Sequence, residues 1–190
     1  MQTLFGIKHH MTQTWDETGI RRSVTVISTP PLTVTRVKTP ASDGYTAIQV
    51  GYGQPQHLRE VRLESDSKLE KGALIKPEDI LKIGDLVSVA GFSKGRGFTG
   101  VVKRYGFKGG PRTHGQSDRE RAPGAIGQGT SPGRIHKGKR MAGHSGNTRF
   151  TVKNLSVLKL DPPTHTLWLA GPVPGHRGSL LIINKLSKLA

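Results

Sequence analysis

The residues predict a mainly β fold, either a small barrel or a sandwich, that is interrupted by one long basic insertion. Short runs rich in β-branched residues recur along the chain, and turns containing glycine, proline or aspartate separate them. Patterns with helical periodicity are scarce. A central stretch is too poor in large apolar side chains to bury a core of its own.

Eight runs are expected to form strands. In chain order they cover residues 22–28, 32–38, 45–50, 85–89, 150–152, 157–160, 166–169 and 180–183. Pro77–Ile80 predicts one helical turn, because proline is favoured at the first helical position. The polar, mixed-charge residues 54–72 predict an excursion over the surface.

The charge balance points to a polyanionic partner. The 190 residues include 29 lysines and arginines against 13 acids, a formal net charge of +16. Such an excess favours polyanionic partners and argues against the role of an acidic protein or of an enzyme for neutral substrates, so no small-molecule substrate is expected. No membrane partner is expected either, because no apolar run is long enough to span one. Because cysteine is absent, disulfides, thiolate zinc sites and cysteine nucleophiles are excluded. Without a signal peptide or a long apolar run, the chain is expected to be a soluble intracellular protein.

Most of this charge lies in one segment. Residues 91–150 hold 13 lysines and arginines, two acids and 15 of the 25 glycines, so they carry +11 of the +16. Leu, Ile, Val and Phe make up 8 of these 60 residues, against 38 of the other 130. We therefore expect a β body formed by 1–90 and 150–190 and a basic extension, 91–149, that a polyanion orders.

The basic clusters of the extension predict contacts with RNA. A run of charges is usually a solvated face, but here acids are nearly missing, so the repulsion calls for a counter-charge. Aromatic rings interleave the cations and could stack on bases or pack at the root of the extension. The candidate contact residues are Lys94, Arg96, Lys103, Arg104, Lys108, Arg112, His114, Arg119, Arg121, Gln128, Arg134, His136, Lys137, Lys139, Arg140, His144 and Arg149. The interleaved rings are Phe98, Tyr105, Phe107, His114 and His136.

A glycine motif leaves one alternative open. Gly95, Gly97 and Gly100 match G-x-G-x-x-G, which binds dinucleotides when a strand precedes it and a helix follows. Residues 101–107 are not expected to form that helix, because they contain Gly106 and a β-branched pair. The glycines are better explained by close approach of the backbone to phosphates.

No catalytic, metal or cofactor site is predicted. The histidine spacings match no metal-ligand pattern, and no carboxylate cluster accompanies them. Asp118 and Glu120 alternate with Arg119 and Arg121, so charge pairing accounts for them.

Several motifs resemble one known family. They are Gly91–Arg104, Pro123–Gln128, Ser131–Arg134, Lys137–His144 followed by Gly146-Asn147, and, outside the extension, Asp43–Tyr45, Ala47–Val50 and Gly171–Gly175. In this order they resemble the universal large-subunit ribosomal protein L-three family, and the length is similar to its bacterial or organellar type. The resemblance spans nearly the whole chain.

The resemblance implies a six-stranded Greek-key barrel of the translation-protein kind, with the extension inserted between strands. It implies a structural protein of the large ribosomal subunit, in the cytoplasm or an organellar matrix, that binds large-subunit rRNA and acts early in assembly. Neighbouring ribosomal proteins would be its other partners. The extension would thread towards the peptidyl transferase centre, with its tip at Gln128, Gly129 and Thr130.

The sequence departs from the family pattern at three places. Thr130 stands where many bacterial members carry a methylated glutamine, so that modification cannot occur here. His10-Met11-Thr12 replaces the usual Gly-Met-Thr, and the region after Tyr52 is shortened. Two other functions compete with the ribosomal one: a nucleotide-dependent or RNA-modifying enzyme built on the glycine motif, and a free nucleic-acid-binding or chromatin-like protein.

Overall fold

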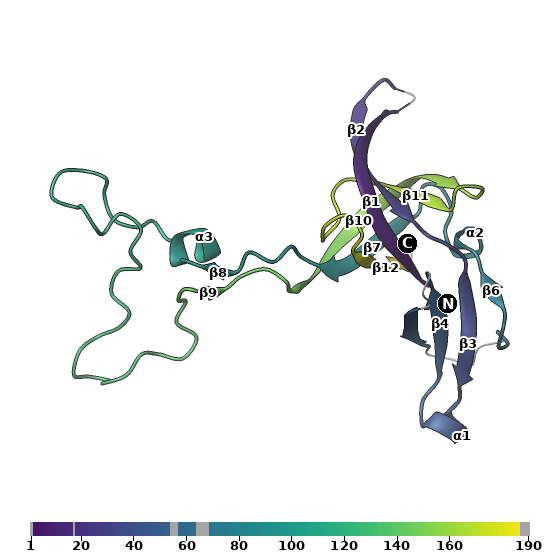
Figure 1. The fold of residues 1–190 in the computed structure, drawn as a ribbon, viewed down its shortest axis with the longest axis horizontal. Coiled ribbons are helices and arrows are strands. Elements are labelled where there is room, and N and C mark those ends of the chain that lie inside the picture. The colour runs from purple at the N-terminus through teal and green to yellow at the C-terminus, as the bar shows by residue number, and fades with distance from the viewer. Residues whose placement is uncertain (1, 17, 54–56, 64–68, 187–190) are drawn as a thin grey trace. The chain divides into compact units, whose positions relative to one another are not determined.

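The chain forms two compact units, both of which contain strands (Figure 1). The body unit comprises Met1–Ser93 and Arg149–Ala190, and the extension unit comprises Lys94–Thr148. The computed structural model describes residues 2–16, 18–53, 57–63 and 69–186. Strands predominate and each helix has only four or five residues, so the predicted mainly β class is confirmed.

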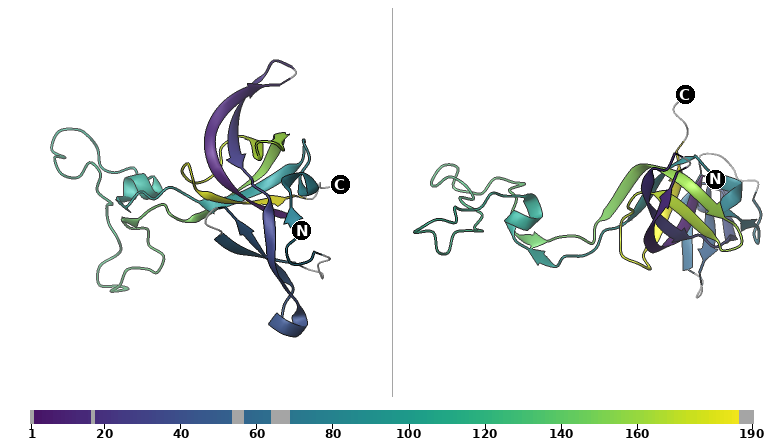
Figure 2. Two further views of the ribbon diagram at one scale, coloured as in Figure 1. Left: turned by 45° about the vertical axis from the view of Figure 1, so that its right-hand side comes forward. Right: turned by 90° about the horizontal axis from the view of Figure 1, so that it is seen from above.

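Six strands of the body unit close into a barrel, in the order β1, β12, β7, β10, β11, β2 (Figure 2). Every neighbouring pair in this ring is antiparallel. The strands are β1 (Thr3–Trp15), β2 (Arg21–Ser28), β7 (Leu86–Phe92), β10 (Arg149–Asp161), β11 (Thr166–Ala170) and β12 (Leu180–Lys185). Where the ring is complete, each strand pairs on both sides, so the barrel lacks the unpaired edges of an open sheet.

Alternating side chains fill the barrel. Leu167 and Leu169 of β11, and Leu181 and Ile183 of β12, are fully buried, while their neighbours along each strand are partly exposed. This period of two is what a strand with one buried face requires. Each such side chain contributes about 1.5–3 kcal/mol of stabilisation by leaving water.

A four-stranded sheet completes the body unit, in the order β5, β4, β3, β6. Its strands are β3 (Leu32–Lys38), β4 (Ala47–Tyr52), β5 (His57–Arg62) and β6 (Leu74–Ile75), and its connections include α1 (Pro40–Asp43) and α2 (Pro77–Ile80). The ring of Tyr52 stacks on Phe5 of β1, with centroids 5.7 Å apart. Sheet and barrel therefore share one hydrophobic core.

The longest N-terminal strand was not among the predicted runs. β1 has 13 residues, but polar Lys8, His9 and His10 interrupt its apolar pattern, and its pairing with β2 shifts between Lys8 and His10. His10 therefore lies in a strand, at an irregularity, and not in a tight turn.

The excursion expected at 54–72 is partly wrong. Residues 57–62 form β5, which pairs with β4 along its whole length although only Val61 is buried. An edge strand with one solvated face has few apolar residues, which is why the pattern did not reveal it. Residues 54–56 and 64–68 of the same range lie outside the described residues.

Two of the predicted runs are one strand. The runs 150–152 and 157–160 belong to β10, and the pairing with β7 shifts between Val152 and Leu155. Asn154, within this shift, has φ of 61°, a left-handed conformation that breaks the period of two. The single helical turn predicted at Pro77–Ile80 is confirmed as α2.

The extension unit has little regular structure: β8 (Phe98–Thr99), α3 (Val101–Tyr105) and β9 (Gly143–His144). The prediction that residues 101–107 are not helical was wrong for the first five. Gly106 ends α3 instead of opposing it, because it adopts φ of 73° and its N–H donates to the carbonyl of Val102. Val101 is buried, which offsets its low helix propensity.

Candidate nucleic-acid interface

The two ends of the extension unit are clamped together. β8 pairs with β9, placing Phe98 opposite His144. Two backbone hydrogen bonds continue this pairing: the N–H of Arg96 donates to Ser145 at 2.8 Å, and the N–H of Ser145 donates to Gly97 at 3.0 Å. The clamp brings cations from both ends of the segment onto one short hairpin-like base.

Beside this clamp, two of the predicted basic clusters meet around one ring. The guanidinium carbons of Arg104 and Arg140 lie 4.9 and 5.4 Å from the centroid of Tyr105. Arg104 also donates from Nη1 to the carbonyl of Met141 at 2.8 Å. Cation–π contact and this hydrogen bond hold together residues that are more than 30 positions apart. The sequence named all three residues but not their contact.

The interleaved rings play different roles. Phe98 is 81% exposed, an unusual state for a phenylalanine, so its ring is available for stacking. Phe107 is half-buried and lies 6.2 Å from the Tyr105 ring, centroid to centroid. Packing within the extension unit is therefore observed for Phe107, whereas base stacking by Phe98 stays a prediction.

The predicted contact residues are almost all on the surface. Sixteen of the seventeen are exposed, and Arg104 is half-buried because it is engaged with Tyr105 and Met141. Sixteen belong to the extension unit, whereas Arg149 is the first residue of β10 in the body unit.

These cations have almost no internal counter-charge. Among the residues of the extension unit, all of which the structure describes, one ion pair is formed, between Arg112 Nε and Glu120 Oε1 at 2.5 Å. The other lysines and arginines of this unit, apart from half-buried Arg104, are exposed and repel one another, which favours binding of a polyanion.

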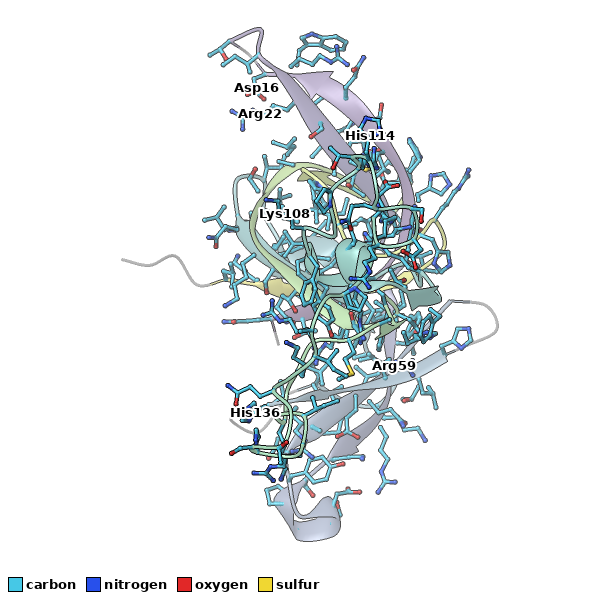
Figure 3. The ribbon with its side chains drawn as sticks, turned by 90° about the vertical axis from the view of Figure 1, so that its left-hand side faces the viewer. Asp16, Arg22, Arg59, Lys108, His114 and His136 are labelled. Carbon is cyan, nitrogen blue, oxygen red and sulfur yellow. The ribbon has the colours of Figure 1, made fainter. Side chains whose placement is uncertain are left out.

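The histidines of the extension unit do not form a metal-binding group. Figure 3 shows Lys108 and His114 on one loop of the extension unit and His136 on another. Within the described part of the chain no group of three or more His, Cys, Asp or Glu side chains is close enough to hold a metal ion. The tip residues Gln128, Gly129 and Thr130 lie in an exposed segment without regular structure.

The glycine motif does not form a dinucleotide site. Gly100 precedes α3, but this helix has five residues, and β8 pairs antiparallel with β9. The dinucleotide fold needs parallel strands joined by a long helix. In the described residues around Gly95, Gly97 and Gly100 no such unit is present.

The structure reveals a further basic cluster on the body unit that the charge count missed. His9 and His10 touch through their Nδ1 atoms at 2.6 Å, and Nη2 of Arg177 lies 3.4 Å from His9 Nε2. The three residues come from β1 and the loop before β12, so their proximity could not be read from either segment. The sequence feature that could have indicated this cluster is the basic pair in Gly-His-Arg-Gly at 175–178.

Two of the three described groups with shifted pKa values, Lys38 and Glu60, form an ion pair, and the third, Asp43, has its pKa lowered chiefly by a hydrogen bond from Ser42. Lys38 Nζ donates to Glu60 and to the hydroxyl of Tyr45, each at 2.6 Å. The bond to Glu60 first, and that to Tyr45 second, raise the pKa of Lys38, and the bond from Lys38 lowers the pKa of Glu60. Both groups are thus kept charged at neutral pH, which suits neither for acid–base catalysis there.

We expect Gly146→Ala to open the clamp. Gly146 has φ of 78°, and a Cβ would lie 2.2 Å from the carbonyl oxygen of Lys94. Because this neighbour is backbone, the substitution must displace the chain. Amide hydrogen exchange at Arg96 and Ser145 should become at least about tenfold faster, since their hydrogen bonds depend on this contact.

Gly138→Ala is the matched control, because Gly138 has a similar φ of 79° but no atom lies within 4 Å of the position that a Cβ would take there. Unchanged exchange at Arg96 and Ser145 in Gly146→Ala would contradict the clamp.

Among the described residues, no helix has the length and apolar composition of a membrane span.

Comparison with known proteins identifies the family of this chain. Residues 47–168 match the family model described as Ribosomal protein L3, and this range contains the whole extension unit.

Relatives match over nearly the full length. The large ribosomal subunit protein uL3 of Dehalococcoides mccartyi is 43% identical over 205 residues, covering 99% of this chain and all of the relative. That of Gloeothece citriformis is 45% identical over 202 residues, covering 95% and 94%. That of Acetivibrio thermocellus is 38% identical over 206 residues, covering 97% of each.

Proposed function

The chain belongs to the ribosomal protein L3 family, and from this premise we propose that it is a structural protein of the large ribosomal subunit that binds large-subunit rRNA directly. The family is a structural component of the ribosome and not an enzyme. The observation that carries the proposal is the set of mostly exposed cations in the extension unit, of which only Arg112 forms an ion pair among the described residues. A surface of this kind fits phosphate-rich RNA, because lysine and arginine contacts with phosphates dominate affinity.

The extension is the principal RNA-binding element in this proposal. Its backbone is irregular and rich in glycine, so it can pass close to phosphates between RNA helices, where a rigid recognition helix would not fit. We assign the seventeen predicted residues to this contact, with Arg149 at its base. The tip residues Gln128, Gly129 and Thr130 would approach the peptidyl transferase centre, and binding would occur early in subunit assembly.

We assign the barrel to the Greek-key type of translation proteins. The order β12, β7, β10, β11 supports this, because three successive barrel strands are followed by a fourth that returns beside the first. Neighbouring proteins of the subunit would contact the body unit.

The structure argues against one of the two competing functions, and the other is left to experiment. A nucleotide-dependent enzyme needs the βαβ unit that the described residues around the glycine motif do not form. A free DNA-binding protein shares the charge but would bind duplex DNA about as well as folded rRNA.

Sedimentation of a cell lysate on sucrose gradients tests the proposal. In low and in high salt, the chain should migrate with large subunits in a one-to-one ratio, since buried RNA contacts resist screening better than exposed ones. Recovery at the top of the gradient, or release at moderate salt, would contradict it. Competition by duplex DNA and by folded rRNA in the free protein separates the ribosomal role from general nucleic-acid binding.

A further inference from the structure

The extension unit contains a cavity that the cation count did not suggest. It has a volume of about 360 Å³ and lies within the loop 107–124. Sites for small organic ligands begin near about 300 Å³, so the cavity is large enough for one nucleotide-sized group and too small for a helix. The lining side chains used below are Phe107, Lys108, Gln116, Arg119, Ala122 and Pro123.

The loop around this cavity is held in place by its own contacts. The N–H of Gly110 donates to the carbonyl of Glu120 at 3.0 Å, and the N–H of Ala122 donates to that of Arg119 at 3.2 Å. The ion pair between Arg112 and Glu120 closes the same loop. The walls are therefore fixed without any side chain filling the space between them.

One wall is aromatic and continues a row of flat groups. Phe107 lines the cavity, and its ring also contacts Tyr105, which in turn contacts the guanidinium groups of Arg104 and Arg140. A nucleobase placed against Phe107 would extend this row. Bases stack on aromatic rings irrespective of their sequence, because every base has a π face.

The rim complements a nucleotide in charge and polarity. Lys108 and Arg119 are exposed cations, Gln116 offers an amide donor and acceptor, and no carboxylate lines the cavity. The nearby carboxylate of Glu120 is already paired with Arg112. A phosphate fits such a rim, and an amide can bond the edge of an unpaired base.

We propose that this Phe107 pocket takes up one unpaired nucleotide of rRNA, with its base against Phe107, its edge at Gln116 and its phosphate between Lys108 and Arg119. The inference rests on the proposed function and adds a defined recognition point to it. The extension would thereby be anchored at one nucleotide, in addition to its distributed phosphate contacts.

The test is chemical probing of rRNA bases in large subunits from cells whose only copy of the chain is wild-type, Phe107→Ala, Gln116→Glu or Ser117→Glu. Phe107→Ala removes the stacking wall, and Gln116→Glu keeps the shape but adds a negative charge at the pocket. Ser117→Glu is the control, because it adds the same charge at an exposed neighbour that does not line the cavity. Both pocket variants should raise the reactivity of the same nucleotide at least about fivefold, the loss expected for one stacked base.

A second measurement does not depend on how the variants fold. Ultraviolet irradiation of wild-type subunits should link a nucleotide to the peptide that contains Phe107, detected by mass spectrometry. Three results would overturn the proposal even though the chain is present in the subunit. They are unchanged reactivity at every nucleotide, a change in Phe107→Ala but not in Gln116→Glu, and a crosslink of this peptide to protein only. Absence of the wild-type chain from large subunits would instead overturn the proposed function, and this inference with it.

Discussion

Replacing residues 93–148 by an Asn-Gly turn is expected to leave a cooperatively unfolding body and to remove most of the affinity for large-subunit rRNA. In the body unit, Phe92 of β7 lies opposite Arg149 of β10, so a two-residue turn can join the strands in the same register. The core of the barrel and sheet contains none of the deleted residues. Because a shorter connection costs less closure entropy, the variant's free energy of unfolding should equal that of the full chain or exceed it by up to about 3 kcal/mol.

The same variant should show a weaker salt dependence of RNA binding. If six or more cations of the extension reach phosphates, the slope of log K against log salt becomes shallower by about 5 or more. Circular dichroism in urea measures folding, and titration with an rRNA transcript at several salt concentrations measures binding. Non-cooperative unfolding would refute an autonomous body, and an unchanged slope would refute the extension as the main RNA-binding element.

Changing Lys137, Lys139 and Arg140 together to Ala should weaken rRNA binding without destabilising the free protein. All three are exposed and have no acidic partner, and exposed substitutions usually alter stability by no more than about 0.5 kcal/mol. Loss of the contact between Arg140 and the Tyr105 ring weakens the extension unit locally by about 0.5–1 kcal/mol, while the core of the body unit, which contains neither residue, keeps its free energy of unfolding. Three lost phosphate contacts reduce the slope of log K against log salt by about 2.1–2.7, so raising the salt from 50 to 200 mM weakens binding of the variant about 20- to 40-fold less than binding of the wild type.

The matched control changes Lys71, Lys82 and Lys153 to Ala. These lysines are exposed in the body unit, so the variant has the same net charge but an intact extension. The control should lose much less affinity than the extension variant. Equal losses in both would mean that only the total charge matters, and unchanged affinity in the extension variant would mean that its cluster is merely solvated.

The sequence predicted those strands in which buried apolar residues recur at every second position. β11 and β12 were placed correctly because buried Leu and Ile alternate with exposed positions over their length. β5 was missed because only Val61 is buried, and β1 because a run of polar residues follows its apolar start. α3 was rejected on propensity, but one buried valine and a C-terminal glycine suffice for a helix of five residues.

The sequence predicted which residues make up the candidate interface but not how they are arranged in space. Charge counting identified which cations are exposed, because a segment without acids or a core has nowhere to bury them. It could not bring Arg104 and Arg140 onto Tyr105, since irregular backbone has no period from which such a contact can be extrapolated. The Phe107 pocket was hidden for the same reason: its walls are joined by backbone hydrogen bonds between non-neighbouring residues.

The place of β12 in the ring has a consequence for the order of synthesis. β12 is the last strand along the chain, yet it lies between β1, the first, and β7. Until β12 has been made, the barrel is an open sheet in which the edges of β1 and β7 that pair with β12 lack their backbone hydrogen-bond partners, although the basic extension has already emerged. Folding therefore ends with a closure between segments about as distant as this chain allows, such as Thr3 and Asn184, and such closures are slow. An incomplete chain therefore exposes unpaired strand edges that can pair with another chain, and this risk of aggregation ends only when β12 docks between β1 and β7.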